Sequence, residues 1–195
     1  WDDRLAEEAS NIFYERNKIL LKIRENSRNF ALGFNKNIRL DIKYLPKIGR
    51  VENDNFFQEY NSPEKIKSFF SISLNKSRSR DIDQRNTTLG PHRDDFGIFF
   101  NDSPASITAS RGQARIISLS LKLSEAEEIK NIVKAKPILI LDDIFSELDE
   151  IMREKVLDEI TGFDQILLST ADLALIDRNK INKAKFFSIK NGSIK

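Results

Sequence analysis

Hydrophobic and polar positions in the first half of the chain repeat mainly with the period of a helix. Residues 3–30 place apolar side chains near helical spacing among many charged ones, which predicts one long amphipathic helix. Residues 38–45 alternate apolar and polar side chains and predict a half-buried strand, which Pro46 ends. Residues 62–76 predict a second helix with Pro63 at its first position, and the turn-rich residues 46–56 predict a loop.

The pattern changes after residue 95, where short apolar segments appear beside a long helical repeat. Residues 96–101 and 105–108 predict two short strands around an Asn-Asp-Ser-Pro turn. Residues 113–132 predict a long helix, because four apolar side chains share one helical face: Ile116, Leu119, Leu123 and Ala126.

The last third of the chain predicts a β-α-β unit. Residues 138–141 are four consecutive apolar residues, typical of a strand covered on both faces. A helix over residues 149–160 leads to a second buried strand over residues 165–168. Parallel strands joined by such a crossover end at one edge of the sheet, where ligands bind in α/β proteins. Residues 186–189 predict one more strand, entering a tight turn at Asn191-Gly192.

Two adjacent carboxylates, Asp142 and Asp143, directly follow the first strand of this unit. Burying an ionised carboxylate without a partner is costly, so the pair should hold something positive or take part in a reaction. An apolar strand ending in acidic residues matches the Walker B pattern, in which the first Asp holds Mg²⁺ through water. Asp143 would then orient or activate a water molecule. The alternative, equally favoured by the pair alone, is that one Asp caps the next helix and the other is solvated.

Two further segments are expected to begin helices, and the first of them could also bind a phosphate. In residues 109–113, ASRGQ, the hydroxyl of Ser110 and the amides around Gly112 are suited to receive a phosphate, and Arg111 adds a fixed charge. A plain Ser N-cap is the favoured interpretation of these five residues alone. Residues 146–149, SELD, follow the Asp pair and also predict a cap, with Asp149 starting a helix.

Composition limits the range of functions. The 195 residues are 39% hydrophobic, enough for a packed core. The absence of cysteine excludes disulfides and thiolate metal sites and favours a reducing compartment, so cytoplasm is expected. The 32 basic residues against 30 acidic ones predict no general affinity for polyanions, so any contact with nucleic acid is local. No apolar run approaches the roughly 18 residues of a membrane helix, and no membrane partner is expected.

One basic cluster and one histidine are weaker candidates. Four basic residues lie close enough together to contact DNA phosphates: Lys76, Arg78, Arg80 and Arg85. The favoured alternative is a flexible, solvated loop in which Asp81 and Asp83 partly cancel the charge. For His92, the sole histidine, a functional role and a structural role in the turn after Gly-Pro both remain open.

Three strings together closely resemble the RecF family, bacterial recombination and gap-repair proteins among the ABC and SMC-like ATPases. They are residues 88–95 (TLGPHRDD), 109–113 (ASRGQ) and 141–149 (LDDIFSELD). The resemblance implies the following site residues: a signature motif at Ser110, Arg111, Gly112 and Gln113, a Walker B aspartate at Asp142, a catalytic carboxylate at Asp143, a D-loop at Ser146, Glu147, Leu148 and Asp149, and switch candidates at Ser169 and Thr170. The first 85 residues resemble the family only in general character.

The departures from the ABC pattern are informative. Arg111 stands where the usual signature has Gly, and Asp143 stands where the catalytic Glu is usual. RecF-like sequences share both changes, and the shorter Asp implies slow hydrolysis. No G-x-x-x-x-G-K-[ST] string occurs, so the phosphate-cradling Walker A half is missing. The chain alone is therefore expected to bind ATP weakly and not to hydrolyse it.

By this resemblance the fold is α/β, the C-terminal part of an ABC-type P-loop ATPase head with a mostly helical inserted lobe. Residues 1–95 would end the inserted lobe, lobe II, and residues 96–195 would form the C-terminal part of the ATPase lobe. The family implies an ATP- and Mg²⁺-dependent homodimer that clamps double-stranded DNA near single-strand gaps. Its expected work is recombinational repair and replication restart, with RecR and RecO as partners.

Two alternatives from other classes remain open. A phospho-acceptor signalling domain also binds Mg²⁺ at an acidic pair, but it needs a further Asp ending the next strand, where this chain has Ser169 and Thr170. It is disfavoured. The other is a structural module that binds DNA or a partner and retains its ATPase motifs only as relics.

Overall fold

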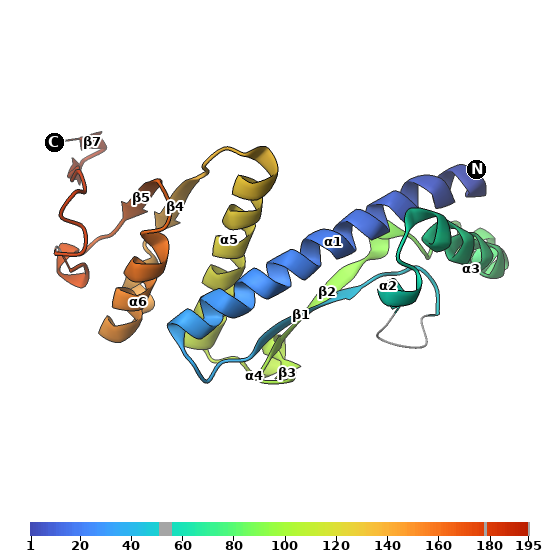
Figure 1. Ribbon diagram of the computed structural model, residues 1–195, viewed down its shortest axis with the longest axis horizontal. Coiled ribbons are helices and arrows are strands. Elements are labelled where there is room, and N and C mark those ends of the chain that lie inside the picture. The colour runs from blue at the N-terminus through green and yellow to red at the C-terminus, as the bar shows by residue number, and fades with distance from the viewer. Residues whose placement is uncertain (51–55, 178, 195) are drawn as a thin grey trace. The chain divides into compact units, whose positions relative to one another are not determined.

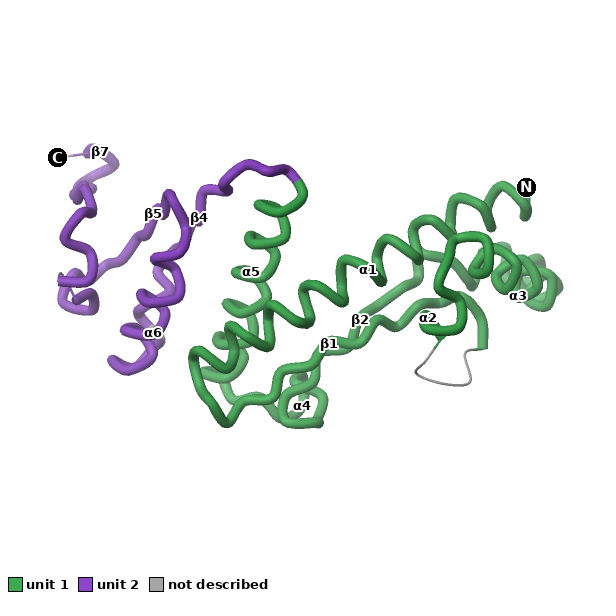
Figure 2. The backbone as a smooth tube through the Cα atoms, viewed as in Figure 1, with its two compact units in different colours: residues 1–132 green, residues 133–195 purple. Residues whose placement is uncertain are grey.

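The computed structural model describes residues 1–50, 56–177 and 179–194 and divides into two compact units. The first unit spans Trp1–Ile132 and the second Val133–Lys195 (Figure 2). Each unit has its own buried residues, so each is described separately. The expected lobe boundary between residues 95 and 96 concerns a larger ATPase and stays a prediction.

Two helices form the frame of the first unit (Figure 1). Helix α1, Asp2–Phe34, confirms the helix predicted over residues 3–30 and extends it at its C-terminal end. Helix α3, Pro63–Asp83, begins as predicted: Ser62 is its N-cap and Pro63 its first residue. It continues well past residue 76. Lys76, Arg78 and Arg80 therefore lie on a helix, and the flexible-loop interpretation is wrong for these three residues.

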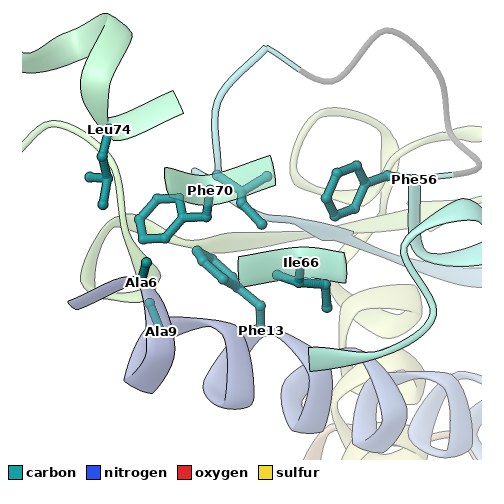
Figure 3. Close-up of a cluster of buried hydrophobic side chains, with 8 residues drawn as sticks. Ala6, Ala9, Phe13, Phe56, Ile66, Phe70 and Leu74 are labelled. Carbon is teal, nitrogen blue, oxygen red and sulfur yellow. The ribbon is translucent and has the colours of Figure 1, made fainter. Parts of the chain in front are cut away.

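A hydrophobic core of the first unit lies between α1 and α3, where small, aliphatic and aromatic side chains pack together (Figure 3). The rings of Phe13 and Phe70 meet edge to face, with centroids 5.3 Å apart and planes at 81°. Ala6 and Ala9 are fully buried beside them and let the helices approach closely. Phe56 opens a short helix, α2 (Phe56–Glu59), that the sequence did not predict. Residues 51–55 of the predicted loop lie outside the described residues.

The first unit also contains a three-stranded antiparallel sheet. Strand β1, Leu40–Leu45, pairs with β2, Asp95–Phe100, and β2 pairs with the two-residue β3, Ser103–Pro104. The predicted strands over residues 38–45 and 96–101 are confirmed.

The strand predicted over residues 105–108 is wrong, because these residues form a helical turn, α4 (Ala105–Thr108). Asn101 and Asp102 both adopt positive φ, which reverses the chain within two residues, and pairing stops at Pro104. The Thr108 hydroxyl then donates to the Pro104 carbonyl at 3.1 Å and closes the helical turn. Helix α5, Arg111–Val133, follows and confirms the predicted long helix.

One carboxylate, Asp94, connects the helix, the sheet and a loop of the first unit. Its side chain is only 4% exposed and accepts a hydrogen bond from Arg16 Nη1 of α1 at 2.9 Å. It also accepts from the Tyr44 hydroxyl at 2.5 Å and from the Lys47 backbone N–H at 2.8 Å. Burial raises the pKa of Tyr44, and the bond to Asp94 raises it further. The TLGPHRDD string therefore has a structural role, in which its carboxylate fixes α1 against β1.

Two other acidic residues, Asp41 and Glu128, bind side chains of α1 through hydrogen bonds and ion pairs. Asp41 of β1 accepts from Arg24 Nε at 2.5 Å and from Arg28 Nη2 at 2.6 Å. Partial burial alone would raise the pKa of Asp41, but the hydrogen bond and charge of Arg24, with the charge of Arg28, lower it. Glu128 of α5 is also nearly buried, and it accepts from Asn26 Nδ2 at 3.0 Å and pairs with Lys22 Nζ at 3.2 Å.

The second unit contains the predicted β-α-β arrangement. Strands β4, Ile138–Asp142, and β5, Gln165–Ser169, are parallel and are connected through helix α6, Glu150–Ile160. The chain is thus a mixed α/β protein with a parallel sheet. Near the C-terminus, β6 (Ile189–Lys190) and β7 (Ser193–Ile194) pair around Asn191-Gly192 at positive φ, which confirms the tight turn. The strand predicted over residues 186–189 is wrong for residues 186–188, which form no strand, and is confirmed only at Ile189.

The expectation that both faces of residues 138–141 are covered is wrong. Burial alternates along β4: Leu139 and Leu141 are buried, whereas Ile138 is 53% and Ile140 70% exposed. In the part of this unit that the structure describes, α6 is the one long helix beside the two-stranded sheet, so a single face is covered. Along the described ranges of the whole chain, no helix has the length and apolarity needed to cross a bilayer.

We expect Asp94→Ala to lower the free energy of unfolding by about 3 kcal/mol, because it leaves Arg16, Tyr44 and the Lys47 amide without their shared acceptor. Asp95→Ala is the matched control, since the Asp95 side chain is exposed and, among the described residues, accepts a hydrogen bond only from the neighbouring Phe96 amide. Urea denaturation followed by circular dichroism measures both. Equal stability of the two variants would show that the buried carboxylate is not a main link in this unit.

Candidate functional site

Asp142, Asp143 and Ser169 meet at the carboxyl ends of β4 and β5, as the crossover predicted. Asp142 and Ser169 are directly paired in the register of the two strands. The Ser169 hydroxyl donates to Asp142 Oδ1 and accepts a hydrogen bond from the Asp143 backbone N–H at 3.0 Å. One hydroxyl thus ties both members of the acidic pair to the neighbouring strand.

Both carboxylates of the pair are exposed to solvent in this unit. The desolvation cost that would apply to buried carboxylates is therefore absent. Asp143 instead adopts a left-handed backbone conformation, φ 45° and ψ 34°, which Asp tolerates better than most residues. This conformation turns the chain from β4 into a short 3₁₀ helix, η2 (Ile144–Glu147), and the Ser146 hydroxyl closes it by donating to the Asp143 carbonyl at 2.9 Å.

The oxygens at this edge fit a magnesium ion that keeps most of its shell as water or phosphate. Among the described residues no group of three or more His, Cys, Asp or Glu side chains is placed to hold a metal. Mg²⁺ is commonly bound through one or two protein oxygens together with water and substrate phosphates, rather than in an all-protein cage. The Asp142 carboxylate and the adjacent Ser169 hydroxyl offer such a partial set.

Residues 146–149 are anchored by Leu148 and by Phe145, which precedes them. Phe145 is fully buried and Leu148 nearly so, and Arg153 Nε donates to the Phe145 carbonyl at 3.1 Å. Asp149 caps α6 by accepting from the Met152 amide at 2.8 Å, which confirms the predicted cap. The side chain of Glu147 lies outside the described residues.

Ser110 and Gln113 form a reciprocal cap at the start of α5, in the first unit. The Gln113 amide donates to Ser110 Oγ at 3.3 Å, and the Ser110 amide donates to Gln113 Oε1 at 2.9 Å. The helix-cap interpretation of Ser110 is therefore confirmed, and the sequence reasoning missed the part that Gln113 plays in it. Arg111 is exposed, and a Cβ added to Gly112 would meet no atom within 4 Å. Packing within the chain does not require glycine there.

Three of the remaining candidates, Thr170, Arg78 and Arg80, have partners within the chain. Thr170 exchanges hydrogen bonds with the backbone of Asp172, so of the two switch candidates only Ser169 reaches the acidic pair. Arg78 pairs with Asp2 at 3.4 Å, and Arg80 Nη2 donates to the Thr88 hydroxyl at 2.8 Å.

Two more candidates lie near the end of α3. Arg85 follows the helix at positive φ. His92 is exposed, and its Nε2 lies 3.3 Å from the Thr87 carbonyl, a contact within its own turn.

Comparison with known proteins gives one consistent result. The chain is 36% identical to "DNA replication and repair protein RecF" of Clostridioides difficile (strain 630) over 198 residues, covering 100% of this chain and 50% of that protein. It is also 36% identical to the protein of the same name from Streptococcus gordonii (strain Challis), covering 100% of this chain and 51% of that protein. No protein-family model matches.

Solved structures agree with these sequence relatives. "Structure of the recombination mediator protein RecF-ATPrS in RecFOR pathway" matches with a TM-score of 0.73 at 31% identity, over 99% of this chain and 48% of that one. A RecF-ATP structure from the same pathway matches with a TM-score of 0.74 at 32% identity, over 89% of this chain and 46% of that one. The chain is thus homologous to RecF proteins along its whole length and spans about half the length of the curated relatives it matches.

We expect Ser110→Ala to lower the free energy of unfolding by about 1 kcal/mol, because the Gln113 amide loses its side-chain acceptor. Ser118→Ala, an exposed site within the same helix, is the control and should be neutral or slightly stabilising. Thermal unfolding of both variants makes the comparison. Equal thermal stability of the two variants would show that the Ser110 cap does not stabilise α5.

Proposed function

We propose that this RecF homologue supplies the signature, Walker B and D-loop parts of an ATP-dependent DNA-binding clamp that acts in recombinational gap repair and replication restart. The observation that carries the proposal is the meeting of Asp142, Asp143 and Ser169 at one sheet edge, in a chain that matches RecF proteins throughout. A domain with relic motifs would have no reason to keep a hydroxyl bridging both acidic residues.

At this edge Asp142 and Ser169 would hold Mg²⁺, which when bound offsets the negative charge of the ATP phosphates. Asp143 is one residue beyond the strand, exposed, and held through its amide by Ser169. We assign to its carboxylate the orientation of the attacking water. An Asp side chain is one methylene shorter than Glu, so its reach toward that water is smaller and slow hydrolysis follows.

The start of α5 would contact ATP bound by a second subunit. Ser110, Arg111, Gly112 and Gln113 present a hydroxyl, a guanidinium and the positive end of a 23-residue helix. Arg111 is exposed and free to reach an anion outside its own chain. In this scheme the γ-phosphate of ATP links two subunits, and hydrolysis of the ATP releases the subunits from each other. Ser146, Glu147, Leu148 and Asp149, the D-loop, would lie at the same junction.

The partners follow from the named relatives and from the charge on α3. RecO and RecR are proposed from the RecFOR pathway in which the matched structures are described. Double-stranded DNA near single-strand gaps is the proposed substrate, with Lys76, Arg78, Arg80 and Arg85 as phosphate contacts. A cytoplasmic location belongs to the same proposal. ATP hydrolysis would need a Walker A sequence, which this chain lacks, so the chain alone should be inactive.

Replacing Asp143 by Asn in the full-length protein should leave ATP binding and dimer closure intact while turnover falls by at least about a hundredfold, because the carboxylate charge that acts on the water is removed. Phosphate release and sedimentation with ATP measure the two effects. Asp164→Asn is the control, since Asp164 precedes β5 at the opposite edge of the sheet and pairs with Lys136 in an exposed ion pair, its only side-chain partner in the described part of the chain. Hydrolysis at the parental rate in Asp143→Asn would contradict the assignment.

Arg111→Ala should weaken ATP-driven dimerisation by about tenfold or more, since a charge-assisted contact to phosphate is lost across the subunit junction. Nucleotide affinity at concentrations too low for dimers should hardly change. Lys122→Ala, which removes an exposed charge from the same helix, serves as the control. Sedimentation with and without ATP gives the result, and unchanged dimerisation in Arg111→Ala would return ASRGQ to the role of a helix cap alone.

A further inference from the structure

A cavity of about 440 Å³ lies beside α3 in the first unit, and its lining residues include neither the acidic pair nor the start of α5. Its size falls within the range of small-ligand sites. Its walls combine three cations with three apolar side chains: Arg50, Lys76, Arg80, Phe69, Ile72 and Leu89. The sequence reasoning found two of these cations as part of a basic cluster but missed Arg50 and the apolar floor.

The cations of the cavity are available to an anion. Arg50 and Lys76 are exposed, and among the described residues neither has a hydrogen-bond or ion-pair partner. Arg80 donates a hydrogen bond from Nη2 to the Thr88 hydroxyl, and its other guanidinium N–H groups remain available to an anion. The nearby carboxylate of Asp81 accepts from the hydroxyls of Ser77 and Thr88, so it is already engaged.

The apolar side chains that line the cavity, Phe69, Ile72 and Leu89, are called its floor, and Gly49 lines the cavity beside them. Ile72 is 57% exposed, although it sits on a helix whose opposite face is buried. Gly49 has φ +129°, and a Cβ there would lie 2.4 Å from Ser73 Oγ and 3.5 Å from Phe69 Cε1. Any side chain at position 49 would therefore be strained and would crowd the wall formed by α3.

The combination of cations and apolar side chains in this cavity favours a single DNA strand over a DNA duplex as its ligand. Contacts to a duplex backbone need cations and polar groups, because the bases are stacked inside and offer no apolar face to a cavity. Single strands are bound by cationic grooves in which an aromatic or apolar surface receives the unstacked base. A cavity lined by Phe69 and Ile72 together with Arg50 and Lys76 matches the second arrangement.

We propose that this cavity binds one unpaired nucleotide of a single DNA strand, with its phosphate on Arg50, Lys76 and Arg80 and its base against Phe69, Ile72 and Leu89. The inference rests on the proposed DNA-binding function and narrows it. Within the basic cluster, Lys76 and Arg80 would then receive the single-stranded side of a gap, and Arg78 and Arg85, which do not line the cavity, would remain as the duplex contacts.

The test compares four variants of the full-length protein in binding a short fluorescein-labelled oligothymidylate and a mixed-sequence duplex of the same strand length, by anisotropy. Ile72→Ser removes apolar floor from an exposed site, and Ile82→Ser, on the same helix but outside the cavity, is its control. Lys76→Glu reverses a charge of the rim, and Lys36→Glu, an exposed lysine beyond α1, is its control.

We expect Ile72→Ser to weaken oligothymidylate binding roughly fivefold and to leave duplex binding unchanged, because only an unpaired base reaches the floor. Lys76→Glu should weaken oligothymidylate binding and lower the magnitude of its salt slope by about 0.7, the value for one phosphate contact on a single strand. Both controls should match the parent protein.

Three outcomes would overturn the inference. If Ile72→Ser leaves oligothymidylate binding unchanged while Lys76→Glu weakens duplex binding, the cavity rim is a duplex contact, and the proposed function stands without this refinement. If a poly-glutamate peptide displaces oligothymidylate as well as unlabelled oligothymidylate does, the cavity is a surface for acidic polypeptides. If the parent protein binds neither DNA, the proposed DNA-binding function itself fails.

Discussion

The buried carboxylate of Asp94 is the interaction on which the first unit most depends. A carboxylate that is 4% exposed requires several donors, and it obtains them from a helix, a strand and a loop that are distant in sequence. The Lys47 backbone N–H donates a hydrogen bond to the Asp94 carboxylate, and the Lys47 carbonyl accepts one from the Gly90 amide at 2.7 Å. Both polar backbone groups of Lys47 are thereby fixed, two residues before Gly49 and three before Arg50. The cavity beside α3 has a defined wall because this carboxylate is satisfied.

Two Asp-Asp pairs in the chain show what sequence reasoning can and does not resolve. Asp94-Asp95 and Asp142-Asp143 both lie at strand ends, but the first contains a buried structural carboxylate and the second is wholly exposed. The deciding partner of Asp94 is Arg16, 78 residues earlier in the chain, and no local pattern indicates that pairing. The partner of Asp142 is Ser169, which the parallel register brought opposite it. That contact was predictable because the crossover of a β-α-β unit fixes which strand ends meet.

The helices and the parallel strands were predictable from periodicity, whereas exposure and short elements were not. The 3.6-residue repeat identified α1 and α5, and Pro63 after Ser62 identified the start of α3. Four consecutive apolar residues predicted burial on both faces of β4, but burial is a property of what covers the strand, and Ile140 is 70% exposed. The turn at Ala105–Thr108 depended on positive φ at Asn101 and Asp102, which the favourable strand propensity of the following Ile107 and Thr108 concealed. The role of Gln113 had a signal, because Ser followed three residues later by Gln is the pattern of a capping box.

The confirmed cap at Ser110 and the proposed phosphate contact are compatible rather than competing. An α-helix leaves the N–H groups of its first turn without intrahelical acceptors. The reciprocal cap occupies the amides of Ser110 and Gln113, while the helix itself offers no acceptor to the amides of Arg111 and Gly112. Gly112 has open space where a Cβ would stand, so an anion could approach those two amides closely. The cap thus fixes the first turn in a conformation that leaves these two amides available to the proposed phosphate, so a role in stability does not compete with the proposed role in binding.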